Sequence, residues 1–231
     1  MPTELVNKPK AILFDLYGTL LDMSDLERKL NKIFNNNKGY TLWLTVLMQY
    51  TIMDNCIGRF NEFTAVAKAT LRMTAKKMRV EVTEEKLDDA LELFKYLPLH
   101  EETIESLSLL QDQGYVLGVL TNASTRIVDE RMERTGLVSY FDTVISCDQI
   151  KKYKPDIVTY KYAARKMEVE PADMLMVASP AWDIYGAGAA GLKTAFMERD
   201  DEGLYPLAAE PTITINSLGH LAQVLSELPD A

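Results

Sequence analysis

The chain has 231 residues, which suits a core domain carrying an insertion better than one small domain. Its net charge of −9 argues against nucleic-acid and anionic-membrane partners, because both attract basic patches. Two cysteines are too few to predict a disulfide framework, and no apolar run reaches membrane-spanning length. Since the N-terminus has no signal-like segment either, we expect a cytoplasmic protein with buried free thiols.

The first predicted element is a short apolar strand over Ala11–Phe14. Apolar spacing and helix-start signals then predict helices as far as Leu97, and these cover Met23–Asn37, Leu42–Met53, Arg59–Lys77 and Thr83–Tyr96. A purely helical stretch after a single strand indicates an inserted cap, residues 21–96.

Beyond the cap, strands and helices alternate. Strands are predicted over Tyr115–Leu120, Thr143–Ser146, Met174–Val177, Lys193–Met197 and Thr212–Ile215, and helices over Glu101–Gln113, Ser124–Thr135, Ile157–Met167, Ala181–Ala190 and Leu218–Leu228. Such alternation predicts right-handed β-α-β units and a parallel sheet. We therefore expect an α/β fold, a Rossmann-like core of residues 1–20 and 97–231 with a helical cap inserted.

The turn after the first strand carries the most specific motif. An acid at the carboxyl end of a buried strand lies where open α/β sheets place ligands, although acids also close strands and start turns. The hexapeptide from Asp15 to Leu20 resembles the first motif of the haloacid dehalogenase superfamily, whose leading Asp is a covalent nucleophile. Superfamily phosphatases have a second Asp two residues later. Tyr17 stands there instead, as in the metal-independent L-2-haloacid dehalogenases, and the resemblance makes Asp15 and Thr19 catalytic and Tyr17 substrate-binding.

Two further motifs follow later strands. Thr121 and Asn122 resemble the second motif, which binds the substrate anion and the departing halide; a turn before a capped helix is the alternative. Lys154 resembles the lysine of the third motif, which opposes the rise in carboxylate pKa that burial causes; a surface lysine is the alternative. Tyr160 matches a dehalogenase active-site tyrosine, or is an ordinary aromatic on a helix face.

The fourth motif region, Val177–Asp183, resembles the dehalogenase form and implies substrate contact by Trp182 and a catalytic Asp183. Two positions depart from it. Ala178 replaces a Ser of dehalogenases, or a metal-binding Asp of phosphatases, and Pro180 replaces an Asn. Because neither Tyr17 nor Ala178 offers a carboxylate to an octahedral Mg²⁺, we expect no metal and no other cofactor.

The cap departs from the family pattern as well. Dehalogenases clamp the substrate carboxylate with an Arg after a Leu-Trp pair, but here Leu44 follows Leu42-Trp43. An aliphatic side chain cannot replace a bidentate arginine, so Arg59 and Arg72 are candidate substitutes. Trp43, Leu44 and Phe63 are predicted to contact substrate, with plain core packing as the alternative.

Together these motifs predict a metal-independent hydrolase that forms an aspartyl ester with a small organic substrate, a 2-haloacid being one candidate. Two alternatives stay open. One is a Mg²⁺-dependent phosphatase of the same superfamily; the other is a catalytically inactive binding protein, which Leu44, Ala178 and Pro180 favour. The resemblance and the apolar stretch Leu42–Met53 also lead us to expect a homodimer.

Overall fold

One parallel sheet forms the centre of the protein, which a computed structural model describes over residues 5–199 and 203–229. Its six strands lie in the order β3-β2-β1-β4-β5-β6. They are β1 (Ala11–Phe14), β2 (Val116–Thr121), β3 (Thr143–Ser146), β4 (Met174–Ala178), β5 (Lys193–Met197) and β6 (Ile213–Ile215). The order reverses between β1 and β4, and open α/β sheets bind ligands beside the carboxyl ends of strands at such a point. The predicted α/β fold is confirmed.

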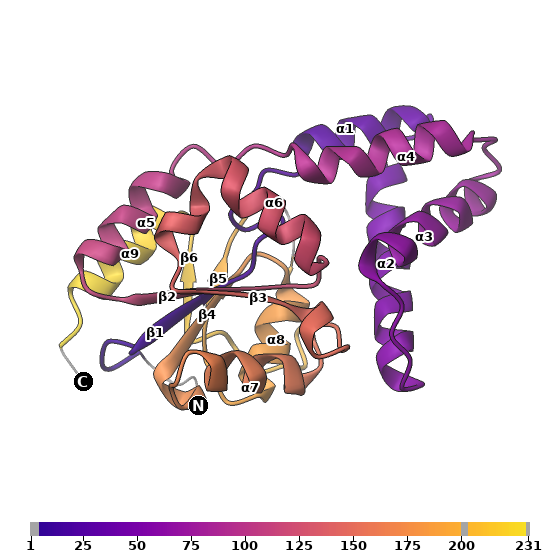
Figure 1. The fold of residues 1–231 in the computed structure, drawn as a ribbon. Helices are drawn as coiled ribbons and strands as arrows, with labels where there is room; N and C mark the ends of the chain where they lie inside the picture. The colour runs from indigo at the N-terminus through magenta and orange to yellow at the C-terminus, as the bar shows by residue number, and fades with distance from the viewer. Residues whose placement is uncertain (1–4, 200–202, 230–231) are drawn as a thin grey trace.

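Helices cover both faces of the sheet (Figure 1). On one face lie α5 (Thr103–Asp112), α6 (Thr125–Thr135) and α9 (Leu218–Ser226), and on the other α7 (Ile157–Lys166) and α8 (Ala181–Ala189). Short 3-10 turns, η2 (Leu137–Tyr140), η3 (Cys147–Gln149) and η4 (Pro171–Asp173), complete the connections. Ile12 and Phe14 pack with the first group of helices, whereas Ala11 and Leu13 pack with the second. Because both faces are buried, this strand is a continuous apolar run in the sequence.

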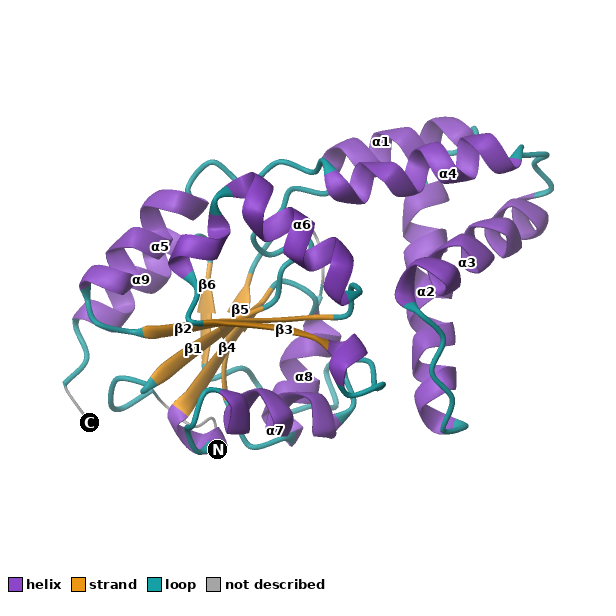
Figure 2. Cartoon of the chain, in the orientation of Figure 1, coloured by secondary structure: helices purple, strands orange, loops and turns teal. Residues whose placement is uncertain are grey.

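The cap contains α1 (Ser24–Ile33), α2 (Gly39–Cys56), α3 (Phe63–Met78), α4 (Glu84–Glu92) and the 3-10 turn η1 (Leu93–Lys95). Figure 2 shows these helices grouped to one side of the sheet. The helix α1 ends before the predicted Asn37 because Asn35 adopts a left-handed conformation with φ of 48°. The helix α2 starts earlier than predicted, where Asn31 Oδ1 accepts the Tyr40 amide at 2.9 Å. The division into core and cap as separate domains stays a prediction.

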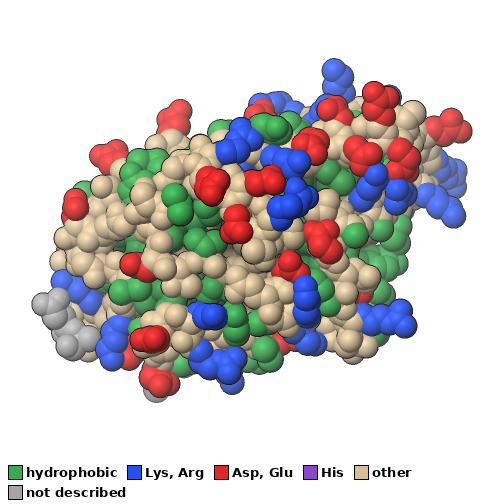
Figure 3. Space-filling model, in the orientation of Figure 1, with side chains coloured by type: hydrophobic (Ala, Val, Ile, Leu, Met, Phe, Trp, Pro, Cys, Tyr) green, Lys and Arg blue, Asp and Glu red, His purple; other side chains and the backbone are tan. Residues whose placement is uncertain are grey.

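Charged side chains of both signs are interspersed over α1 and α4 in Figure 3. Some of them form ion pairs between cap helices, such as Lys29 with Asp89 and Arg72 with Glu84. Exposed pairs of this kind contribute little stability each. The packing of the cap therefore depends mainly on its buried apolar residues, among which Trp43 is fully buried.

A direct contact joins the cap to the loop that carries Lys154. The Asn55 amide donates to Tyr153 O at 2.7 Å and accepts from Tyr153 N at 3.0 Å. Phe60 stacks on the Tyr153 ring, with 4.9 Å between centroids. These contacts hold the end of α2 against the carboxyl edge of the sheet, so the cap faces the residues that follow β1 and β4.

The cysteines are free, but only Cys147 is buried. Cys56 is exposed, because it is the last residue of α2, so the prediction of two buried thiols is wrong for it. None of the helices in the described ranges is long and apolar enough to cross a membrane. Of the N-terminal segment judged to lack a signal, residues 1–4 lie outside the described ones.

Candidate active site

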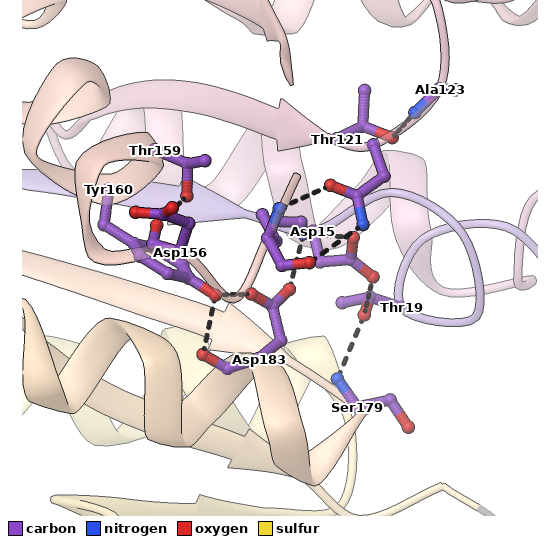
Figure 4. Close-up of polar contacts among 11 residues, drawn as sticks. Asp15, Thr19, Thr121, Ala123, Asp156, Thr159, Tyr160, Ser179 and Asp183 are labelled. Carbon is purple, nitrogen blue, oxygen red and sulfur yellow. Dashed lines mark hydrogen bonds and ion pairs between the residues drawn. The ribbon is translucent and has the colours of Figure 1, made fainter. Parts of the chain in front are cut away.

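Asp15 lies where β1 ends, and both oxygens of its carboxylate are held (Figure 4). Its amide donates to Val177 O at 3.0 Å, which extends the β1–β4 pairing by one residue. Asp15 Oδ1 accepts from Lys154 Nζ at 2.7 Å and Oδ2 accepts from Thr19 Oγ1 at 3.0 Å. Gly18 has a φ of +84°, which lets the chain turn so that Thr19 faces Asp15. Thr19 Oγ1 is itself fixed by the Ser179 amide at 3.0 Å.

Lys154 lies between two carboxylates. Its buried ammonium donates to Asp15 at 2.7 Å and to Asp183 at 2.5 Å. Burial by itself lowers the pKa of Lys154, but the attraction of Asp15 and Asp183 outweighs it and leaves that pKa above its ordinary value. Asn122 fixes the Lys154 backbone, because its Oδ1 accepts from Lys154 N at 2.7 Å and its Nδ2 donates to Lys154 O at 3.3 Å. These two hydrogen bonds hold the Asn122 amide against the Lys154 backbone, and its contact with substrate stays a prediction.

Asp183 is fully buried in the first turn of α8. Tyr160 Oη donates to Asp183 Oδ1 at 2.5 Å, while Lys154 binds Oδ2. Burial raises the pKa of Asp183 to about 6, although Lys154 opposes that rise. Burial and then Asp183 raise the pKa of Tyr160 well above 10.0, so Tyr160 donates as a neutral phenol. Asp183 therefore combines a fixed geometry with the affinity for protons that a general base near neutral pH needs.

The donor set does not fit a magnesium ion. Both Asp15 and Asp183 are already bonded to Lys154, and Tyr17 and Ala178 supply no carboxylate. Within residues 5–199 and 203–229, no group of three or more His, Cys, Asp or Glu side chains is arranged to hold a metal. An octahedral Mg²⁺ would need oxygen ligands that these positions lack.

Two more predicted residues reach the same edge of the sheet. Thr121 ends β2, and its buried Oγ1 accepts from Ala123 N at 3.3 Å. Trp182 is half-buried, with its ring centroid 5.7 Å from Lys154 Nζ, so the ring covers part of the ammonium group. The four predicted catalytic residues, together with Thr121, Asn122, Tyr160 and Trp182, come from distant parts of the sequence to this edge.

A small apolar cavity lies between the cap and the carboxyl edge of the sheet. Its lining residues are Tyr17, Phe63, Thr64, Ala67, Leu91, Phe94, Ala123 and Ile127. About 10 Å³ is open to the centre of a water molecule, which is room for about one water. Phe63 lines this cavity, and its contact with substrate stays a prediction. Trp43 lies behind the lining, with Nε1 donating to Ala67 O at 3.2 Å, and Leu44 is half-buried outside it.

The two proposed substitutes for the cap arginine lie away from the cavity. Arg59 is exposed, and Arg72 is exposed and donates to Glu84 at 2.7 and 2.6 Å. The structure instead buries Arg131, on α6, which the sequence analysis did not single out. The available signal was its position on the apolar face of the helix, since the buried Ile127 and Val128 precede Arg131 by four and three residues.

Comparison with known proteins agrees with this geometry. The chain is 26% identical to (S)-2-haloacid dehalogenase 4A of Burkholderia cepacia over 226 residues, which cover 97% of this chain and 95% of that protein. A crystal structure of an L-2-haloacid dehalogenase superimposes with a TM-score of 0.89 at 25% identity, covering 95% of this chain and 99% of the other. A dehalogenase solved with an intermediate complex gives 0.87 at 26% identity, covering 96% and 100%.

A family model decides the assignment. The model of haloacid dehalogenase-like hydrolases matches residues 9–191, which include β1 with Asp15, the Lys154 loop and the first turn of α8 with Asp183. These elements carry the carboxylates and the ammonium group described above. The chain is therefore a hydrolase and belongs to the haloacid dehalogenase-like family.

Proposed function

We propose that this hydrolase displaces a leaving group from a small organic acid through an aspartyl-ester intermediate, as a 2-haloacid dehalogenase. The observation that carries the proposal is the Asp15 carboxylate, which Lys154 and Thr19 hold at 2.7 and 3.0 Å at the carboxyl end of β1. A carboxylate that is paired with an ammonium group and oriented in this way is suited to nucleophilic attack on carbon. The names of the Burkholderia cepacia relative and of the structure that superimposes with a TM-score of 0.89, both 2-haloacid dehalogenases, point to the same reaction.

In the first step, an Asp15 oxygen attacks the halogen-bearing carbon, and the halide leaves with the bonding electron pair. The ester that forms carries no negative charge on Asp15, so Lys154 then balances Asp183 alone. Thr19 keeps the attacking oxygen aligned, and Trp182 shields the ammonium from water. Orientation of this kind supplies much of the rate enhancement in displacement reactions.

In the second step, water attacks the carbonyl carbon of the Asp15 ester and gives up a proton to Asp183. The oxygen of the departing hydroxy acid takes that proton back from Asp183, the second proton of the water is released to solvent, and the carboxylate of Asp15 is restored. Asp183 suits this role because its raised pKa of about 6 makes it a stronger base than an ordinary aspartate while it stays mostly ionised at pH 7. No step requires a metal, consistent with a donor set in which Lys154 occupies both carboxylates.

The test is a panel of 2-haloacids and phosphate esters, assayed with EDTA and with added Mg²⁺, for the wild type and Asp15→Asn. We expect halide release that survives EDTA and is lost in Asp15→Asn. Multiple turnovers in ¹⁸O-water should place the label in the Asp15 carboxylate. Turnover of phosphate esters that needs Mg²⁺ would assign the protein to the phosphatases instead. Halide release without label in Asp15 would exclude the ester.

A homodimer is the assembly we propose. Its support is the cluster of exposed apolar side chains late in and just after α2, namely Ile52, Met53 and Ile57. Apolar residues grouped on a surface are typical of protein contacts. Sedimentation should show dimers at micromolar concentration, and Ile52→Lys combined with Ile57→Lys should give monomers; a wild-type monomer would refute the proposal.

A further inference from the structure

A guanidinium without a carboxylate partner is buried beside the cap cavity. Arg131 is 2% exposed and lies one turn after Ile127, which lines the cavity. Its Nη1 donates to Leu97 O at 2.6 Å and its Nη2 to Phe94 O, while Nε has no hydrogen-bond partner. Within the described residues, no Asp or Glu pairs with Arg131. Carbonyl dipoles do not cancel a full charge, so this burial is costly unless an anion completes the site.

A second unpartnered polar atom lies near Arg131. Tyr17 Oη is buried and has no hydrogen-bond partner, and Tyr17 lines the cavity. The Tyr17 ring packs edge-on against Phe94, with 5.5 Å between the ring centroids, and Phe94 O accepts from Arg131 Nη2, so Tyr17 and Arg131 contact the same residue. Burial raises the pKa of Tyr17 to about 12, while the charge of Arg131 and its N–H groups, which can donate to the hydroxyl, lower it. Tyr17 Oη can accept from Arg131 and still has its own proton to donate, so an anion beside them would accept from the hydroxyl and balance the charge of the guanidinium.

The site carries a net negative charge before an anionic substrate binds, so a second cation is needed to bind that substrate. Asp15 and Asp183 carry two negative charges, Lys154 carries one positive charge, and the buried group is left with one net negative charge. A substrate carboxylate adds a second, in surroundings where like charges repel strongly. Lys154 is already paired with two carboxylates. The position at which dehalogenases have the cap arginine, after Leu42-Trp43, holds the uncharged Leu44, so it supplies no cation for the substrate carboxylate.

We propose that Arg131 and the Tyr17 hydroxyl bind the carboxylate of the substrate, in the role that the cap arginine would otherwise fill. This rests on the proposed function for the identity of the substrate. In a 2-haloacid, the carboxyl carbon is bonded to the carbon under attack, so an anion site must adjoin the nucleophile. Tyr17 meets that requirement, since it follows Asp15 by two residues in the same turn.

The kinetic test compares an acid with its neutral amide, 2-chloropropionate with 2-chloropropionamide, which share the reacting carbon. Arg131→Gln removes the charge and keeps an amide donor for the two carbonyls. We expect it to lower kcat/KM for the acid by about 10- to 100-fold and to change the amide far less. Arg131→Lys should fall between. Arg134→Met is the matched control: this exposed cation on α6 lies 4.1 Å from the centre of the Tyr96 ring, and its loss should leave the acid-to-amide ratio unchanged.

An equal loss for acid and amide in Arg131→Gln would show that Arg131 only holds Phe94 and Leu97, and would overturn the proposal. Melting curves establish that each variant is folded. If Arg131→Gln does not fold, Arg131→Lys and Tyr17→Phe carry the comparison, and an unchanged acid-to-amide ratio in both overturns the proposal equally.

Calorimetric binding of lactate and lactamide separates this proposal from the proposed function, because it needs no turnover. Lactate that binds the wild type and binds Arg131→Gln at least tenfold more weakly supports the anion site, even if no 2-haloacid is a substrate. Lactate that binds both equally, or binds neither, overturns it. A variant that changes only inhibition by chloride would assign Arg131 to the leaving halide and overturn the assignment to the carboxylate.

Discussion

Replacing Lys154 with Met should be the most damaging single change at this site. The ammonium is 1% exposed and pairs with Asp15 at 2.7 Å and with Asp183 at 2.5 Å. Without it, two buried carboxylates face each other with no counter-charge. Breaking a buried pair by removing one partner costs about 3–5 kcal/mol, because the remaining charge is left uncompensated. For a chain of this size, each kcal/mol shifts Tm by about 2–4 °C, so we expect Tm to fall by roughly 6–20 °C.

The double variant Lys154→Met with Asp183→Asn tests the cause of that loss. It carries one buried negative charge at this site, as the wild type does, so it should recover part of the lost Tm while halide release stays at least 10²-fold below wild type. Lys151→Met is the matched control, since its ammonium pairs with Asp148 on the surface and should change stability by less than about 1 kcal/mol. A Lys154→Met protein as stable as the control, or a double variant no more stable than the single one, would refute the charge argument.

The acid Asp183 and its helix give three further expected outcomes. The pH profile of kcat should fall on its acid side, because Asp183 must be ionised to accept a proton from the water that attacks the ester, and Asp183→Asn should remove this acid limb. The limb should lie near or below about pH 6, since the Asp15 charge that helps to raise the pKa of Asp183 to about 6 is absent in the ester. Tyr160→Phe removes a hydrogen bond to the ionised carboxylate and should move the limb up by about one pH unit; an unmoved limb would contradict the assignment. Gly186→Ala should lower the free energy of unfolding by about 1–3 kcal/mol, since a Cβ there lies 2.6 Å from Tyr160 Oη. Gly188→Ala, whose nearest contact is 3.9 Å, should not, and equal urea midpoints for the two would contradict this packing.

Local patterns in the sequence were enough to predict the fold and the main members of the site. The apolar run Ala11–Phe14 and the later alternation of strands and helices determine a parallel sheet, because a strand buried on both faces needs apolar residues throughout. The position of Asp15 at the end of that run placed it at the ligand-binding edge. The ends of helices were predicted less accurately. The helix α1 was predicted to end at Asn37 but ends earlier, because Asn35 adopts a left-handed conformation.

Only the tertiary structure decided how the charges at the site are shared and which cation is buried near the cavity. Lys154 pairs with two acids that lie 139 and 29 residues away in the sequence. A local sequence pattern cannot predict that one lysine is shared by two such distant acids. Trp43 and Leu44 do not line the cavity that Phe63 lines, because helix spacing gives the apolar face of a helix but not the neighbour that covers it. The burial of Arg131 depends on the chain between Phe94 and Leu97 crossing α6, so its environment exists only once cap and core are packed together.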